Sequence, residues 1–118
     1  MTQERSHFTV RKSGDVNIVE FADRKILEEL SISEILEGLT QLVASSRAIK
    51  LLLSFQNVEH LSSAALGMLI TLNKHVGEQR GTLKLSNIAP QIYEVFKITR
   101  LNKLFDIYNT KEEALESH

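Results

Sequence analysis

A short apolar run in the middle of the chain, residues 49–55, constrains the fold more than any other feature. It reads IKLLLSF, and five of its seven residues are apolar. Because successive side chains of a strand point to opposite faces of a sheet, such a run fits a strand that is buried on both faces. Strands of this kind occur in largely parallel sheets that helices cover on both sides. The run therefore predicts an α/β fold.

The segments before this strand predict a hairpin and one helix. Residues 7–12 and 15–21 alternate apolar and polar side chains around the turn signal Ser13-Gly14-Asp15, which indicates an antiparallel hairpin. Residues 22–30 form a charged connection to which no element is assigned. Ser31 to Glu34 has the spacing of a capping box, and apolar residues then recur at steps of three and four up to about Ser45.

The segments after the strand alternate between helix and strand. A helix is expected over 64–79, ended by a left-handed Gly81, and a strand over 82–86. Pro90 suits the first turn of a third helix, with Ile92, Val95, Phe96 and Thr99 on one face. A strand over 104–108 and a second capping box, Thr110 to Glu113, precede a short terminal helix with Ala114 and Leu115 turned inward.

The predicted order is therefore β-β-α-β-α-β-α-β-α, a single mixed, mostly parallel sheet with an N-terminal antiparallel hairpin. A chain of 118 residues corresponds to one domain, residues 1–118. With 14 basic and 15 acidic residues it offers no basic face for nucleic acid. It has no apolar run near the roughly 20 residues of a membrane span and no signal-peptide core, so we expect a cytoplasmic protein without direct membrane insertion.

Motifs for catalysis or cofactor binding are absent from the sequence. It contains no GxGxxG, P-loop or GxSxG pattern, and the absence of cysteine excludes thiol nucleophiles and cysteine-ligated zinc. The four histidines show no metal-ligand spacing. We therefore expect no catalytic residue, no metal and no cofactor. The acids Glu28, Glu29, Glu34 and Glu37 fit either a solvated helix face or a recognition surface for a basic partner.

Two adjacent serines, Ser62 and Ser63, lie after the buried strand and directly before the second predicted helix. A helix N-terminus presents unpaired N–H groups and partial positive charge, which suit an oxyanion or a phosphate. In one interpretation Ser62 is the helix cap and Ser63 is merely a small first-turn residue. In the other, Ser62 caps the helix and leaves the Ser63 hydroxyl exposed to a kinase. Spacing alone leaves both open.

Nearly the whole chain resembles a STAS domain, the module shared by sulphate transporters and bacterial anti-sigma-factor antagonists. Strand residues 51–55, then Val58 and residues 61–67, parallel the family's apolar strand, D-S-S-G-L-G motif and apolar helix. The tail, residues 96–105, 107–108 and 112–115, is also typical of it. The sequence departs from the motif in carrying Ser62 for the aspartate, Ala64 for the second serine and Ala65 for the glycine.

The resemblance implies a regulatory protein of a bacterial partner-switching pathway. In antagonists of this family the serine after the aspartate, here Ser63, is phosphorylated by a partner kinase that is itself the anti-sigma factor. The unphosphorylated form binds that partner, and phosphorylation ends the contact. The partner would be an anti-sigma factor or serine kinase. The docking residues expected on this basis are Leu61, Ser62, Ser63, Ala64, Ala65, Gly67 and Met68.

Two other functions remain open from the sequence. STAS-like domains also serve as non-phosphorylated adaptor subunits of membrane transport complexes, and the missing aspartate favours that alternative. A small-molecule binder or an enzyme is the third possibility, although no catalytic constellation accompanies the serines.

Overall fold

A mixed sheet forms the centre of the protein. The computed structural model describes residues 3–4 and 7–118. The sheet has the strand order β1-β2-β3-β5-β7-β8, in which β1, β2 and β3 are antiparallel and the remaining neighbours are parallel. The strands are β1 (Gln3–Glu4), β2 (Phe8–Ser13), β3 (Val16–Phe21), β5 (Lys50–Ser54), β7 (Thr82–Ser86) and β8 (Asp106–Tyr108). The predicted fold class is confirmed.

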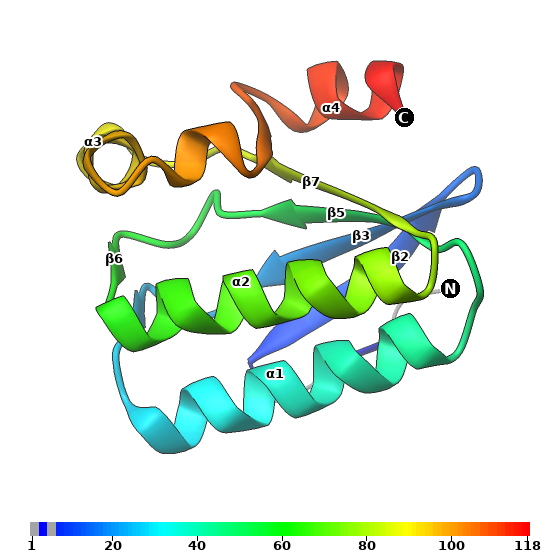
Figure 1. The fold of residues 1–118 in the computed structure, drawn as a ribbon, viewed down its shortest axis with the longest axis horizontal. Coiled ribbons are helices and arrows are strands. Elements are labelled where there is room, and N and C mark those ends of the chain that lie inside the picture. The colour runs from blue at the N-terminus through cyan, green and yellow to red at the C-terminus, as the bar shows by residue number, and fades with distance from the viewer. Residues whose placement is uncertain (1–2, 5–6) are drawn as a thin grey trace.

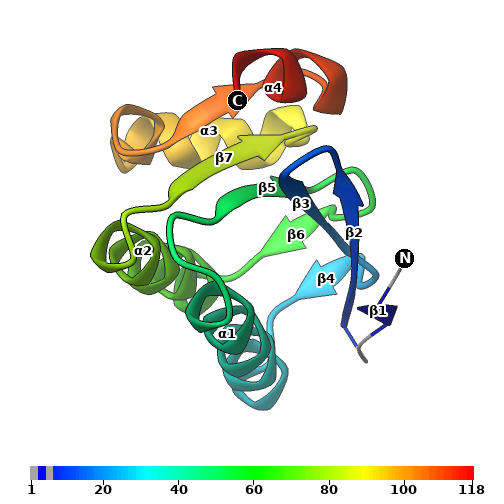
Figure 2. The ribbon, with the colours of Figure 1, turned by 90° about the vertical axis from the view of Figure 1, so that its right-hand side faces the viewer.

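Helices cover both faces of the sheet (Figures 1 and 2). They are α1 (Glu29–Ala44), α2 (Ser63–Glu78), α3 (Pro90–Ile98) and α4 (Lys111–Ser117), with a 3-10 turn η1 (Leu101–Lys103) after α3. The helices α1 and α2 pack against each other on one face, and α4 lies on the other. Leu51 and Leu53 of β5 join the core beneath α1 and α2, whereas Leu52 packs with Ala114 of α4. The central strand is thus buried on both faces, as the sequence predicts.

A second, two-stranded sheet lies beside the first and was not predicted. Its strands, β4 (Lys25–Ile26) and β6 (His60–Leu61), pair in parallel. The strand β4 lies within the connection 22–30 to which the sequence assigned no element. The Ser62 N–H donates to the Ile26 carbonyl at 3.1 Å, so this small sheet fixes the backbone that enters α2.

Two predicted helix ends are wrong. The first helix begins at Glu29 rather than at Ser31, because the chain turns into the helix directly after β4 and the Ile32 N–H already donates to the Glu28 carbonyl at 2.9 Å. The left-handed residue after α2 is Arg80, with φ of 60°, rather than Gly81. Gly81 is needed for close approach, because a Cβ there would lie 2.6 Å from the carbonyl oxygen of Ile49.

The C-terminal third differs in detail from the prediction. Ile92 and Phe96 are buried as expected, but Val95 and Thr99 on the predicted inner face are exposed. The predicted strand over 104–108 is shortened to β8, because the N–H groups of Leu104 and Phe105 donate back to the Leu101 carbonyl and close the turn after η1. Thr110 caps α4 by accepting from the Glu113 N–H at 3.1 Å, as the capping-box spacing predicts. Ala114 is buried and Leu115 is partly buried.

Candidate functional site

Ser62 is the N-cap of α2. Its backbone is extended, with φ −81° and ψ 167°, and its Oγ accepts from the Ala65 N–H at 3.1 Å. The Ser62 carbonyl accepts the first helical bond, from the Leu66 N–H at 3.1 Å. Both the side chain and the carbonyl of Ser62 are therefore used to start the helix.

Ser63 is the first residue of α2 and is exposed. The cap bond to the helix comes from Ser62, so Ser63 is not needed for it. The first N–H groups of a helix lack intrahelical partners and carry partial positive charge. A phosphate on Ser63 would therefore sit beside groups that favour an anion.

The predicted docking residues divide into accessible and buried positions. Ser63, Ala64 and Gly67 are exposed, and Leu61 and Ser62 are partly exposed. Ala65 and Met68 are 0% and 4% exposed because they lie on the inner face of α2. Contact with a partner stays a prediction, and the candidate docking surface is narrowed to the other five residues because two buried side chains offer a partner little surface.

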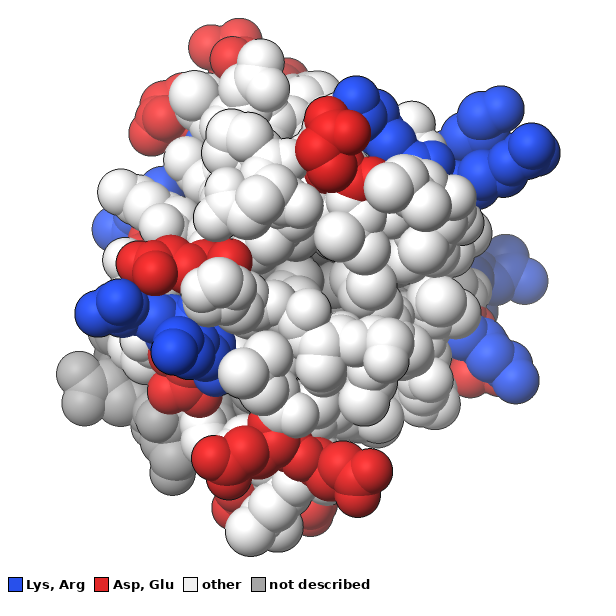
Figure 3. All heavy atoms as spheres, turned by 90° about the vertical axis from the view of Figure 1, so that its left-hand side faces the viewer, with Lys and Arg blue, Asp and Glu red and all other residues white. Residues whose placement is uncertain are grey.

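The surface around the start of α2 is largely uncharged, as Figure 3 shows, and charged side chains lie around its edge. Some of these neutralise one another: Arg24 Nε lies 3.2 Å from a Glu59 carboxylate oxygen, and Lys97 Nζ lies 2.9 Å from Glu94. A negative group added to this surface would therefore change its charge strongly, because the surface itself is largely uncharged.

A small groove opens beside this surface, between β6 and α3. Its volume is about 120 Å³, and its lining is apolar with a polar border: Leu61, Leu66, Ile92, Val95, Glu59, His60 and Gln91. Sequence reasoning missed it because it joins segments some thirty residues apart. The one local signal is Val95, an apolar residue of α3 that is exposed beside two buried ones.

His60 and His7 lie in different surroundings. His60 borders the groove, whereas His7 lies apart, with Nδ1 2.7 Å from Asp23 and Nε2 3.3 Å from Glu34. Burial alone would lower the pKa of His7, but the hydrogen bonds and charges of those two carboxylates raise it above its ordinary value. Among residues 3–4 and 7–118, no group of three or more His, Asp or Glu side chains could hold a metal ion. In the same residues no helix has the length and apolar character needed to cross a membrane.

Similarity to known proteins is found in sequence and in structure. An anti-sigma-B factor antagonist of Bacillus subtilis is 31% identical over 61 residues, which are 52% of this chain and 56% of that protein. The chain spans little more than half the length of the curated relatives it matches, between 52% and 59%.

Solved structures share the fold over almost the whole chain. An anti-sigma-factor antagonist (STAS) domain protein from Planctomyces limnophilus has a TM-score of 0.85 at 22% identity, covering 93% of this chain and 96% of that one. The Bacillus cell fate determinant SpoIIAA in its phosphorylated form has a TM-score of 0.68 at 14% identity, covering 93% and 97%. At these identities the likeness shows the fold alone.

The family assignment comes from a match to a family model. The model described as the STAS domain matches residues 7–114, from the first residue before β2 to the buried Ala114 of α4. Both the Ser pair and the groove lie within the matched range. The chain belongs to the STAS domain family.

Proposed function

We propose that this protein is an anti-sigma factor antagonist that binds a protein partner, an anti-sigma factor or serine kinase, through the surface around Ser63. Phosphorylation of Ser63 switches the contact off. The relatives named as antagonists support the binding role, and a phosphorylated form of SpoIIAA supports the chemistry of the switch. The protein needs no cofactor for this role.

The observation that carries the proposal is the division of labour between the two serines. The Ser62 Oγ accepts the cap bond from the Ala65 N–H, and the next residue, Ser63, is exposed. A kinase needs a hydroxyl that is accessible and not required by the fold. Ser63 meets both conditions, whereas Ser62 does not.

The effect of a phosphate follows from the surface that receives it. A phosphoserine carries about −1.5 to −2 charges at neutral pH. On the largely uncharged surface of Figure 3, a docked partner would have to desolvate that charge. A coupling of about 1–3 kcal/mol would weaken the partner's affinity roughly 5- to 150-fold. The N-terminus of α2 accommodates the charge within the protein, so the switch needs no change of fold.

Serine at position 62 in place of an acid is compatible with this switch. Serine and aspartate are both good N-caps, and the cap bond is present. A neutral cap also places no like charge next to the phosphate. What it removes is a carboxylate that could present the hydroxyl or recruit the kinase.

Intact-mass spectrometry tests the acceptor site. The purified chain is incubated with ATP and the purified serine-kinase anti-sigma factor encoded nearest its own gene. We expect the mass of one phosphate on the wild type and none on Ser63→Ala. Ser33→Ala, which removes an exposed serine of α1, is the matched control and should accept one phosphate. Unmodified wild type, or an equal phosphate on Ser63→Ala, would refute Ser63 as the switch.

The alternative is a non-phosphorylated adaptor of a membrane transport complex. The observation that favours it is the absence of an acid at position 62. An adaptor would co-purify with a transport ATPase, and that contact would be unchanged by Ser63→Ala. The antagonist would instead lose its response to ATP and the kinase in the same variant.

A further inference from the structure

Exposed apolar side chains gather at the end of the molecule that carries Ser63. Among residues 3–4 and 7–118, six large apolar side chains are exposed. Five of them lie just before α1, in its first turn, in α3 and in the turn after η1: Leu27, Leu30, Val95, Ile98 and Leu104. These elements flank the N-terminus of α2 (Figure 1). Single exposed apolar residues are ordinary, but a group at one end of a small protein indicates an interaction surface.

The group divides into two patches of opposite charge. The acidic patch, residues 27–30, is Leu-Glu-Glu-Leu at the start of α1. The basic patch, residues 98–104, holds Arg100 and Lys103 between Ile98 and Leu104. Within the described residues, none of these four charged side chains belongs to an ion pair. In Figure 3 acidic groups lie along the lower edge and basic groups at the upper right, with uncharged surface between them and both kinds of charge at the left.

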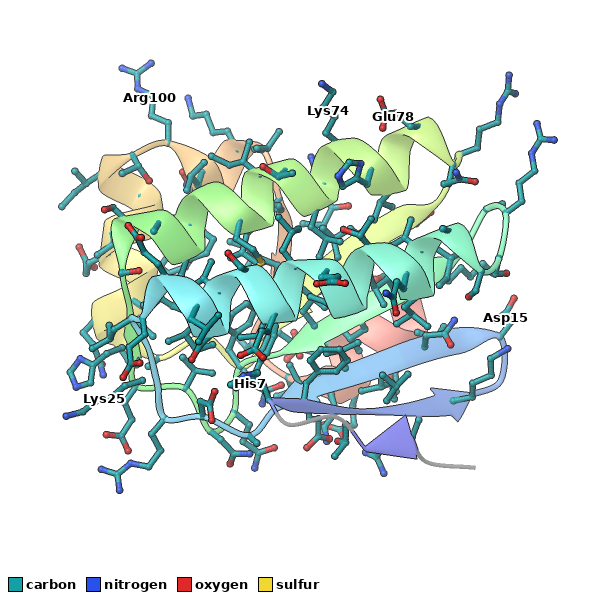
Figure 4. All side chains as sticks on the ribbon, turned by 90° about the horizontal axis from the view of Figure 1, so that it is seen from below. His7, Asp15, Lys25, Lys74, Glu78 and Arg100 are labelled. Carbon is teal, nitrogen blue, oxygen red and sulfur yellow. The ribbon has the colours of Figure 1, made fainter. Side chains whose placement is uncertain are left out.

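Such a surface is complementary to itself. A two-fold axis places the same patch of both subunits in one interface, so that residue i of one copy meets residue j of the other, and the reverse. In such a dimer the acidic patch of each copy faces the basic patch of the other, so the favourable contact occurs twice. The Arg100 side chain points outward, where a second molecule can reach it (Figure 4). A net charge of −1 leaves little overall repulsion between copies.

We infer that this end of the molecule docks a second copy of the same chain, forming a reversible two-fold dimer. The Ser62 N–H donates to the Ile26 carbonyl, next to the acidic patch, and the groove joins Leu61 and Leu66 to Val95 of α3. A dimer across both patches therefore covers the groove and Ser63. Only the monomer then offers Ser63 to another protein. This inference goes beyond the proposed function and does not require Ser63 to be phosphorylated.

Sedimentation velocity over a range of protein concentrations tests the inference without any other protein. The wild type should shift from monomer to dimer as its concentration rises, and added salt should weaken the dimer. Two charge variants follow from the two patches. Glu28→Lys with Glu29→Lys makes both patches basic, and Arg100→Glu with Lys103→Glu makes both acidic. Each alone should dimerise roughly 5- to 30-fold more weakly, since both symmetric contacts become repulsive.

Mixing the two charge variants gives the decisive measurement. One now has two basic patches and the other two acidic ones, so an equimolar mixture should restore association. Arg80→Glu is the matched control, because Arg80 is also exposed and left-handed, with φ of 60° against 63° for Arg100, but lies beyond the other end of α2. It should dimerise as the wild type does. A wild type that stays monomeric throughout, or a mixture that stays monomeric while circular dichroism shows both variants folded, would overturn the inference.

Discussion

Replacing Ser62 by alanine tests the division of labour in the Ser pair through stability alone. The substitution removes the one side-chain bond that caps α2, from the Ala65 N–H to Ser62 Oγ at 3.1 Å. It leaves the backbone bonds to Ile26 and Leu66 in place. Loss of an N-cap costs about 1 kcal/mol of the free energy of unfolding. For a domain of this size that lowers Tm by about 3 to 6 °C.

Its neighbour supplies the matched control. Ser63 is exposed and does not make the cap bond, so Ser63→Ala should leave the free energy of unfolding within about 0.5 kcal/mol of wild type. Ser62→Asp should retain the stability of the wild type, because aspartate caps as well as serine and its charge suits a helix N-terminus. These three variants separate the cap from the exposed hydroxyl.

Urea unfolding followed by circular dichroism measures the difference. The midpoint should fall for Ser62→Ala with an unchanged slope, since a cap alters stability and not the surface exposed on unfolding. If Ser63→Ala is destabilised as much as Ser62→Ala, then Ser63 also supports the fold, and its freedom to be modified is refuted.

Two further predictions concern a pair of glycines and one histidine. Gly81→Ala should destabilise the protein by about 1 to 3 kcal/mol, because its Cβ would lie 2.6 Å from the Ile49 carbonyl oxygen. Gly67→Ala should stabilise the protein by about 0.5 to 1 kcal/mol, because Gly67 lies within a helix and has open space around it. Urea midpoints that do not move in opposite directions would contradict this. The pKa of His7 is raised above 6.5 in the folded state, so its stabilising contribution is fully present below pH 6.5 and is lost as the pH rises through the folded pKa. Thermal unfolding across this range should show that loss in the wild type and not in His7→Gln; equal profiles would refute it.

The parts of the fold that sequence could predict are those with a strong periodic signal. Residues 49–55 indicate a strand buried on both faces, and Leu51 and Leu52 do lie in the cores on opposite sides of the sheet. Apolar residues that recur at steps of three and four predict which sides of α1 and α2 face the core. The start of α1 was predicted wrongly, because Ser31 has a capping pattern although the helix already begins at Glu29, directly after β4.

The parts that could not be predicted depend on contacts between distant segments. Two-residue strands such as β4 and β6 are too short to show alternation, yet their pairing positions Ser62. The groove likewise needs Leu61 and Val95 to meet across the fold. The position of Ser63 at the start of a helix was predictable from the sequence. The burial of Ala65 and Met68 was not allowed for, although both follow the inner-face spacing of α2.

In the proposed switch, a phosphate on Ser63 ends a contact with a protein partner. The most direct test is the affinity of the purified anti-sigma factor for the unphosphorylated and the Ser63-phosphorylated chain, measured side by side by isothermal titration calorimetry. We expect phosphorylation to weaken binding roughly 5- to 150-fold. Equal affinities for the two forms, with the phosphate verified on Ser63, would contradict it.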